Sequence, residues 1–295
     1  MANWIIQNTF LSTEKYSWQA EALAAAARGS GIDLKIIGNA DALFCWDGHG
    51  AHMLPGRDAP GFVIALDKDI PLLRALEASG ARVFNSADAV ELCDDKMKTH
   101  MRLSRAGVPM PRTIPAPMTY SNIGYSDFSF LRPIVGALGL PLVVKERCGS
   151  FGQQVHLAKS KAETEAILRA AGGPVLFQEY IAESSGRDLR LYMVGDRCPA
   201  SMERFSLSGD FRASVSQGGE ARRHIPTEGE MKIARACMSA LGLDFAGVDI
   251  LFGKDGPLLC EVNSSAHFKS ALLYTGIDIS GDIVAHAARQ TGLPV

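Results

Sequence analysis

No apolar run in this chain of 295 residues reaches the roughly 20 residues that a membrane-spanning helix needs. The stretch from Met1 to Asn8 has no basic segment followed by a long apolar one, so we expect no secretion signal. A formal charge of −2, from 30 basic and 32 acidic residues, gives no sign of a nucleic-acid or acidic-membrane partner. We therefore expect a globular, cytoplasmic protein that binds neither nucleic acid nor membrane.

The sequence also lacks cysteine pairs of the C-x-x-C type and repeats of solenoid length. Its six cysteines are scattered, which is typical of reduced side chains that pack in a core and not of a zinc site or a disulfide framework. His49 and His52 have the spacing of a metal pair, but no further ligands cluster beside them. An ordinary loop is the preferred interpretation of that segment.

Residues 1–92 alternate strand and helix patterns, which predicts a small α/β domain with a parallel sheet. No G-x-G-x-x-G follows the first strand, so this domain does not have the fingerprint of a dinucleotide-binding site. The expected strands cover 4–7, 34–37, 62–66 and 81–85, and the expected helices cover 16–27 and 70–78.

Two further units follow, at 93–181 and 182–295, and both mix helices with strand hairpins, which gives them α+β character. A helix should begin at Asp94-Asp95-Lys96, and another near Phe128, where Pro133 makes the start uncertain. Thr227 and Glu230 form a capping box for a helix that Gly242 ends. Strands or hairpins are expected at 141–146 with 155–158, at 175–181, at 186–205 and at 245–263.

A strand lysine, Lys145, precedes a turn that contains Gly149, Ser150 and Gly152. Such a turn can fold its backbone amides over phosphate groups while the lysine supplies a point charge. A plain hairpin has the same local pattern. This motif alone leaves both interpretations open.

Three oxygen-bearing side chains gather on the last hairpin. Glu261 and Asn263 are two apart on a strand and so point to one face, and the hairpin can bring Asp249 alongside them. Two carboxylates and an amide oxygen suit Mg²⁺ or Mn²⁺, with phosphate oxygens and water completing the shell. The alternative is a turn-capping aspartate beside a solvated strand end, and spacing does not decide between them.

The order of these motifs resembles that of ATP-grasp carboxylate–amine ligases, and most closely their RimK-type, α-L-glutamate ligase-like branch. The resemblance covers about residues 90 to 290, while the first ninety fit the domain that precedes the ATP-grasp fold only by their α/β pattern. The motifs are Lys96, Lys145 with the glycine turn, Gln178-Glu-Tyr-Ile181, Asp188-Leu-Arg190, Gly209-Asp-Phe-Arg212, Gly247-Val-Asp249 and Glu261-Val-Asn263.

The resemblance implies a two-lobed ATP-grasp fold and a role for each motif. Lys96 and Lys145 would contact the nucleotide phosphates, the turn at 149–152 would close as a lid, and Asp188 would take the ribose hydroxyls. Gln178, Glu179, Tyr180 and Ile181 would form the adenine slot. Asp249, Glu261 and Asn263 would hold two magnesium ions, with Mn²⁺ as an alternative.

The implied reaction is attack of a carboxylate on the γ-phosphate of ATP, followed by capture of the acyl phosphate by an amine. Glutamate or another amino acid would be joined to a peptide or small molecule, by a homodimer or homotetramer. Arg204 and Arg212 are candidates for holding the transferred phosphoryl group, with Arg190 behind them. Alternatives are a silent ATP-binding regulatory protein and a D-alanine–D-alanine ligase-like enzyme.

Two segments depart from the RimK-type pattern. After Arg212 the chain has Ala-Ser214-Val-Ser216-Gln217 where the pattern has Ser-Asn-Leu-His-Arg. After Ser265 it has Ala-His267-Phe-Lys269 where the pattern tends to Pro-Gly-Leu-Glu, so a base replaces an acid. We therefore expect the activation chemistry to be kept and the substrate to be open.

Overall fold

The N-terminal part folds as the alternating pattern predicts, into a parallel sheet flanked by helices. The computed structural model describes residues 2–11, 14–56, 58–120, 122–149, 152–213, 215 and 218–293. The sheet has the order β2-β1-β5-β6, and all three of its pairings are parallel. Its elements are β1 (Asn3–Gln7), α1 (Glu14–Gly29), β2 (Leu34–Gly38), β5 (Phe62–Ala65), α2 (Ile70–Ala78), β6 (Arg82–Phe84) and α3 (Ala87–Asp94).

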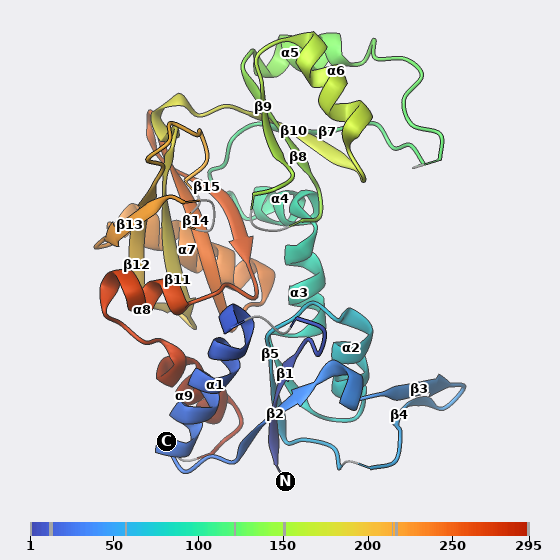
Figure 1. Cartoon of the computed structure of the whole chain (residues 1–295), viewed down its shortest axis with the longest axis vertical. Coiled ribbons are helices and arrows are strands. Elements are labelled where there is room, and N and C mark those ends of the chain that lie inside the picture. The colour runs from blue at the N-terminus through green and yellow to red at the C-terminus, as the bar shows by residue number, and fades with distance from the viewer. Residues whose placement is uncertain are drawn as a thin grey trace.

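A short antiparallel hairpin, β3 (Phe44–Asp47) and β4 (Gly50–Met53), extends from this domain after the 3₁₀ turn η1 (Asn39–Asp41) (Figure 1). It contains the two histidines with metal-pair spacing. His52 Nε2 lies 3.2 Å from Asp47 Oδ1, and both side chains are about half exposed. Within the described ranges no group of three or more His, Cys, Asp or Glu could hold a metal. The segment, expected as an ordinary loop, is a short antiparallel hairpin.

The central lobe is an antiparallel sheet of order β7-β10-β8-β9 that α5 and α6 cover. α5 begins at Leu131, three residues after the expected start, so that Pro133 falls in its first turn, where a missing backbone N–H costs no helical hydrogen bond. The elements are β7 (Thr113–Pro115), α5 (Leu131–Leu138), β8 (Leu142–Glu146), β9 (Val155–Ala158), α6 (Lys161–Ala170) and β10 (Val175–Glu179).

The C-terminal lobe is an antiparallel sheet of order β13-β12-β11-β14-β15, with both predicted hairpins in place. Apolar side chains of its strands pack against α7, and α4 lies between this helix and the central lobe (Figure 1). The elements are α4 (Lys96–Arg105), η2 (Ala182–Ser184), β11 (Arg187–Val194), β12 (Arg197–Phe205), β13 (Glu220–Arg223), α7 (Glu228–Leu241), β14 (Phe245–Gly253), β15 (Gly256–Asn263), α8 (Lys269–Thr275) and α9 (Ser280–Gln290).

The last helix, α9, returns to the N-terminal domain and packs against α1 (Figure 1). Ile283, Val284 and Ala287 share a buried cluster with Leu23 of α1 and Phe62 of β5. The predicted boundary at 92/93 also falls inside α3, whose Ala89 and Cys93 pack with strands of the C-terminal lobe. The first and last units are thus joined by a common apolar core. Over the described part of the chain, no helix is long and apolar enough to cross a membrane.

The capping box at the start of α7 is present as predicted. Thr227 Oγ1 accepts from the Glu230 backbone N–H, and Glu230 Oε2 accepts from the Thr227 backbone N–H. Thr227→Ala should therefore lower the free energy of unfolding by about 1 kcal/mol, because one N–H of the first turn loses its acceptor. Urea denaturation would measure this loss. Thr227→Ser keeps the hydroxyl and should stay close to wild type; an equal loss in both variants would contradict a capping role.

Candidate active site

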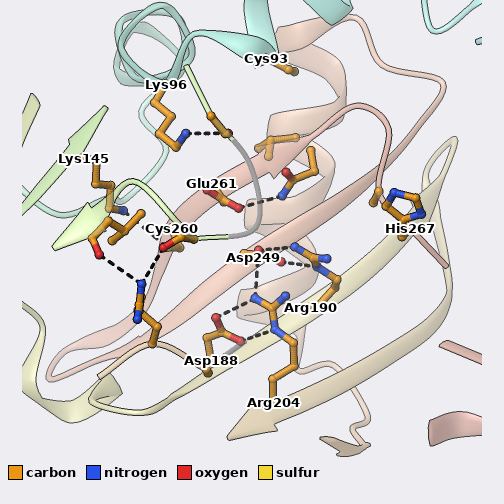
Figure 2. A pocket seen from close by; sticks show the side chains of 18 of the residues that line it. Cys93, Lys96, Lys145, Asp188, Arg190, Arg204, Asp249, Cys260, Glu261 and His267 are labelled. Atoms are coloured by element: carbon orange, nitrogen blue, oxygen red, sulfur yellow. Dashed lines mark hydrogen bonds and ion pairs between the residues drawn. The ribbon is translucent and has the colours of Figure 1, made fainter. Parts of the chain in front are cut away.

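A cavity of about 750 Å³ lies where the central and C-terminal lobes meet (Figure 2). This volume is within the range of small-molecule sites. Ser150 lies outside the described residues, and every other predicted site residue lines the cavity. These are Lys96, Lys145, Gly149, Gly152, Gln178, Glu179, Tyr180, Ile181, Asp188, Arg190, Arg204, Arg212, Asp249, Glu261 and Asn263.

Strand register brings the charged residues of the C-terminal sheet together. Arg190 of β11 is paired with Asp249 of β14, and Asp249 is paired in turn with Glu261 of β15. On the other side of β11, Asp188 is paired with Arg204 of β12. Paired residues put their side chains on the same face of an antiparallel sheet. Asp188 and Arg190 are two residues apart on β11, so the five side chains lie in two neighbouring rows on one face of the sheet, across four strands.

Two arginines hold Asp249, which is 2% exposed. Arg190 donates through Nε to Oδ1 (2.7 Å) and through Nη2 to Oδ2 (2.6 Å), and Arg204 Nη2 lies 3.0 Å from Oδ2 (Figure 2). Burial alone would raise the pKa of Asp249, but the two guanidinium groups outweigh it and hold that pKa below its ordinary value. Asp249 is thus ionised, as a metal ligand must be.

Arg204 also donates through Nε and Nη2 to the two carboxylate oxygens of Asp188, at 2.7 Å each. The four residues form a buried cluster in which two positive and two negative charges balance. Both oxygens of Asp188 are engaged here, so contact with a ribose would have to share them with Arg204. Nη1 of Arg190 and Nη1 of Arg204 have no partner among the described residues, so each can still donate to an anion.

The three predicted metal ligands have oxygens left for a cation. Asn263 donates through Nδ2 to Glu261 Oε1 at 3.1 Å, which leaves the amide oxygen of Asn263 as an acceptor. Asp249 Oδ1 accepts one bond from Arg190, and a carboxylate oxygen has about two lone-pair sites. Glu261 has no cationic partner within the part of the chain described. The donor set therefore fits a hard divalent ion such as Mg²⁺.

Lys145 is a buried cation with no acidic partner among the residues that the structure describes. It is 6% exposed, and Cys260 Sγ lies 3.9 Å from its Nζ. Lys96, at the start of α4, donates through Nζ to the carbonyl of Gly149 at 3.2 Å. Since a buried charge is stabilised when it is paired, Lys145 favours an anion bound in the cavity. A phosphate oxygen can serve as that anion.

Side-chain hydrogen bonds hold both Gly149 and Gly152, the residues of the glycine turn that the structure describes. Gly149 and Gly152 have φ of +145° and +67°, which favour glycine. Arg212 Nη1 donates to the carbonyl of Gly152 at 2.7 Å, while Asp210 accepts from Arg212 Nε at 3.0 Å and from Nη2 at 2.7 Å. Arg212 therefore fixes one end of the turn in this structure through its hydrogen bond to the carbonyl of Gly152. To hold a phosphoryl group it would have to release that carbonyl.

The predicted adenine segment lies at the end of β10. Glu179 directs its carboxylate to Arg112, with Nε and Nη2 each at 3.0 Å from an oxygen. Its backbone N–H donates to the Arg112 carbonyl at 2.9 Å, so neither group is left for a base. Tyr180 meets Phe211 edge to face, with ring centroids 6.5 Å apart. Gln178 is 2% exposed and has polar partners on neighbouring elements.

Sequence analysis missed the part of the cavity that comes from the N-terminal domain, where Leu66, Asp67 and Lys68 lie just past the end of β5. His267 and Lys269, from the segment that departs from the RimK-type pattern, also line the cavity. One signal could have found the first three, because ligands of open parallel sheets bind beyond the carboxyl ends of the strands. The altered loop residues Ser214, Ser216 and Gln217 lie outside the described residues.

Comparison with known proteins agrees with this geometry. A model of the RimK-like ATP-grasp domain matches residues 93–287. A probable α-L-glutamate ligase of Pseudoalteromonas translucida is 32% identical over 293 residues, which cover 93% of this chain and 92% of that one. A ribosomal protein bS6–L-glutamate ligase of Escherichia fergusonii is 38% identical over 223 residues, covering 74% and 71%.

The fold also matches that of the ATP-grasp ligase PsnB, solved with a minimal precursor, Mg and ADP. The TM-score is 0.72 at 17% identity, with 98% of each chain covered. The predicted α/β fold class and the family resemblance are both confirmed. The chain belongs to the RimK-like ATP-grasp family and is an ATP-dependent ligase that joins a carboxylate to an amine.

Proposed function

We propose that the chain activates its carboxylate substrate as an acyl phosphate and releases ADP and phosphate. The observation that carries this proposal is the buried Nζ of Lys145, which has no acidic partner among the described residues, in a cavity that also contains the three-oxygen ligand set. A single site thus offers a cation for phosphate and ligands for a metal that binds phosphate. That combination suits transfer of a phosphoryl group.

In the first step a carboxylate oxygen attacks the γ-phosphorus, and the bond from that phosphorus to ADP breaks. Both reactants are anions, so charge repulsion is a large part of the barrier. Lys145 and Lys96 would hold the polyphosphate, and the Nη1 groups of Arg190 and Arg204 would stabilise charge on the transferred group. When bound, Mg²⁺ would neutralise phosphate charge. We propose that Asp249, Glu261 and Asn263 hold two such ions, with Mn²⁺ as an alternative metal.

In the second step the amine nitrogen attacks the acyl carbon. The bond from that carbon to the phosphate oxygen breaks, phosphate leaves, and the nitrogen loses a proton. We propose that Gln178, Glu179, Tyr180 and Ile181 hold the adenine, that Asp188 contacts the ribose, and that the turn with Gly149, Ser150 and Gly152 acts as a lid. Arg212, which donates a hydrogen bond to the turn, would then set the position of that lid.

The product ratio tests the mechanism. Incubation with ATP, Mg²⁺ and a mixed pool of amino acids and short peptides should release ADP and phosphate in equal amounts, with the amide product identified by mass spectrometry. AMP and pyrophosphate would exclude the acyl phosphate. Tight ATP binding without turnover on a broad panel would favour a regulatory protein that kept the fold.

We propose an amino acid as one substrate, and glutamate is the first to test because the relatives above are named glutamate ligases. His267 and Lys269 line the cavity and belong to a segment in which the chain departs from the RimK-type pattern. We therefore expect the second substrate, to which the amino acid is joined, to differ from that of the relatives. The predicted homodimer or homotetramer stays a prediction.

A further inference from the structure

The N-terminal domain holds the segment that directly follows Asn263, the last of the three predicted metal ligands. Three consecutive residues of this segment each share a hydrogen bond with a different part of that domain. The carbonyl of Ser264 accepts from Asn85 Nδ2 at 2.7 Å, Ser265 Oγ donates to the carbonyl of Leu66 at 2.8 Å, and the carbonyl of Ala266 accepts from Gln19 Nε2 at 3.5 Å. The position of 264–266 is therefore set from outside the lobe that carries the metal ligands.

Asn85 makes the most extensive of these connections. It directly follows β6 and is 0% exposed. Besides the bond to Ser264, its Nδ2 donates to the carbonyl of Phe245 at 2.8 Å, and its Oδ1 accepts from the backbone N–H groups of Asp244 (2.7 Å) and Phe245 (3.2 Å). A side-chain amide has two hydrogens and two lone pairs on its oxygen, so all of its bonds are made. Because carbonyls only accept and N–H groups only donate, the amide has a single orientation.

The backbone segments that Asn85 joins are the start of β14 and the chain just past β15. Phe245 is the first residue of β14, and Asn263 is the last of β15. The ladder between these strands ends where Asn263 is paired with Gly247. There the chain passes so close to β14 that a Cβ added at Gly247 would lie 2.7 Å from Ala266 Cβ. Beyond this pair the Asn85 amide connects the two segments in place of backbone pairing.

We propose that Asn85, assisted by the bond from Ser265 to Leu66, is a positioning residue for the metal site. It fixes the backbone on the C-terminal side of Asn263 and so keeps that side chain beside Glu261, in the arrangement that fits a divalent ion. The inference rests on the proposed function, which assigns Mg²⁺ to these ligands. Residues that orient a ligand without touching the metal typically change metal affinity by about 10–100-fold when they are replaced.

Isothermal titration calorimetry of the full chain with ATP, in EDTA and at saturating Mg²⁺, tests this without knowledge of the substrates. The ratio of the two dissociation constants measures what the metal adds to binding. In Asn85→Asp the Oδ1 acceptor is kept, but at least one of the two carbonyls loses its donor, so the ratio should fall about tenfold. The affinity for ATP in EDTA should stay close to that of the wild type, because Lys96 and Lys145 are unchanged.

Asn3→Asp is the matched control. Asn3 is a buried asparagine of the same domain that also joins two backbone segments. Its Nδ2 donates to the carbonyl of Asp33 at 3.2 Å, and its Oδ1 accepts from the N–H of Phe62 at 3.1 Å. Both of these segments belong to the N-terminal domain, so the variant should lose stability and keep the wild-type ratio. An equal fall of the ratio in both variants would show that Asn85 acts only in folding.

Ser265→Ala keeps the inference testable if Asn85→Asp does not fold, since it removes only the bond to the Leu66 carbonyl. It should lower the ratio by about two- to fivefold, and Ser265→Thr, which keeps the hydroxyl, should preserve it. An unchanged ratio in the folded variants would overturn this inference and leave the ATP site in place. A wild type that binds ATP equally well in EDTA and in Mg²⁺ would overturn the metal assignment together with this inference. No binding of ATP under either condition would overturn the proposed function itself.

Discussion

A Lys145→Met variant should lose nucleotide binding while its ligand-free form becomes more stable than the wild type. Lys145 is buried, and no acidic side chain among the described residues compensates its charge. An uncompensated buried polar group costs about 1–3 kcal/mol, and methionine fills a similar volume without a charge. The ligand-free protein should gain stability from the change. The nucleotide, in contrast, should lose the cation that pairs with its phosphates.

Thermal unfolding with and without ATP and Mg²⁺ measures both effects on one sample. In the wild type, ATP at about 100 times its Kd should stabilise the fold by about 2.7 kcal/mol, and this increment should vanish in Lys145→Met. Lys159→Met is a matched control, because Lys159 is exposed and follows β9 of the same hairpin. A variant that keeps the ATP-dependent shift would contradict the assignment of Lys145. A ligand-free variant less stable than wild type would show that its charge is compensated.

The face that carries the three predicted metal ligands was accessible from sequence because it depends on local patterns. Glu261 and Asn263 are two residues apart on a strand, and a tight turn brings the strand of Asp249 beside them; the pairing of Asp249 with Glu261 also needs the register shift between Asp249 and Ile250. Lys145 is the penultimate residue of β8, four positions before Gly149 of the glycine turn. These features follow from the period of a strand and from turn chemistry. The resemblance to a family then joined them in one site.

Contacts between distant segments were not accessible in this way. The pairing of β11 with β14 places Arg190 opposite Asp249, and no local pattern specifies which strands become neighbours. Arg190 and Arg204 were predicted to hold the phosphoryl group, but their ion pairs with Asp249 were not predicted. The packing of α9 on α1 has the same origin, since an amphipathic helix does not reveal which surface it covers. In the sequence, His100 is likewise a single polar residue on a helix, and nothing local indicates which residues it contacts.

Those arginine partners lead us to expect different results from two substitutions in the metal site. Asp249→Asn and Glu261→Gln should each lower turnover by about 10²–10³-fold, because each weakens charge stabilisation of the phosphoryl transfer. Asp249→Asn should also cost up to about 3–5 kcal/mol of stability, since it leaves two buried guanidinium groups with one carboxylate. Within the described residues the Glu261 carboxylate has one hydrogen bond, from Asn263, so Glu261→Gln should cost less than about 1 kcal/mol.

Urea denaturation and ADP release under saturating ATP and Mg²⁺ would separate the two roles, with Asp255→Asn as the control. Asp255 lies exposed in the turn of the same hairpin, so this variant loses a nearby charge without touching the cavity. Near-normal turnover in Glu261→Gln would refute the metal assignment, whatever happens at position 249. Unchanged stability in Asp249→Asn would instead mean that Arg190 and Arg204 find other partners. Because Glu261 lacks the arginine contacts, a loss of turnover in Glu261→Gln at wild-type stability would assign that loss to the metal site alone.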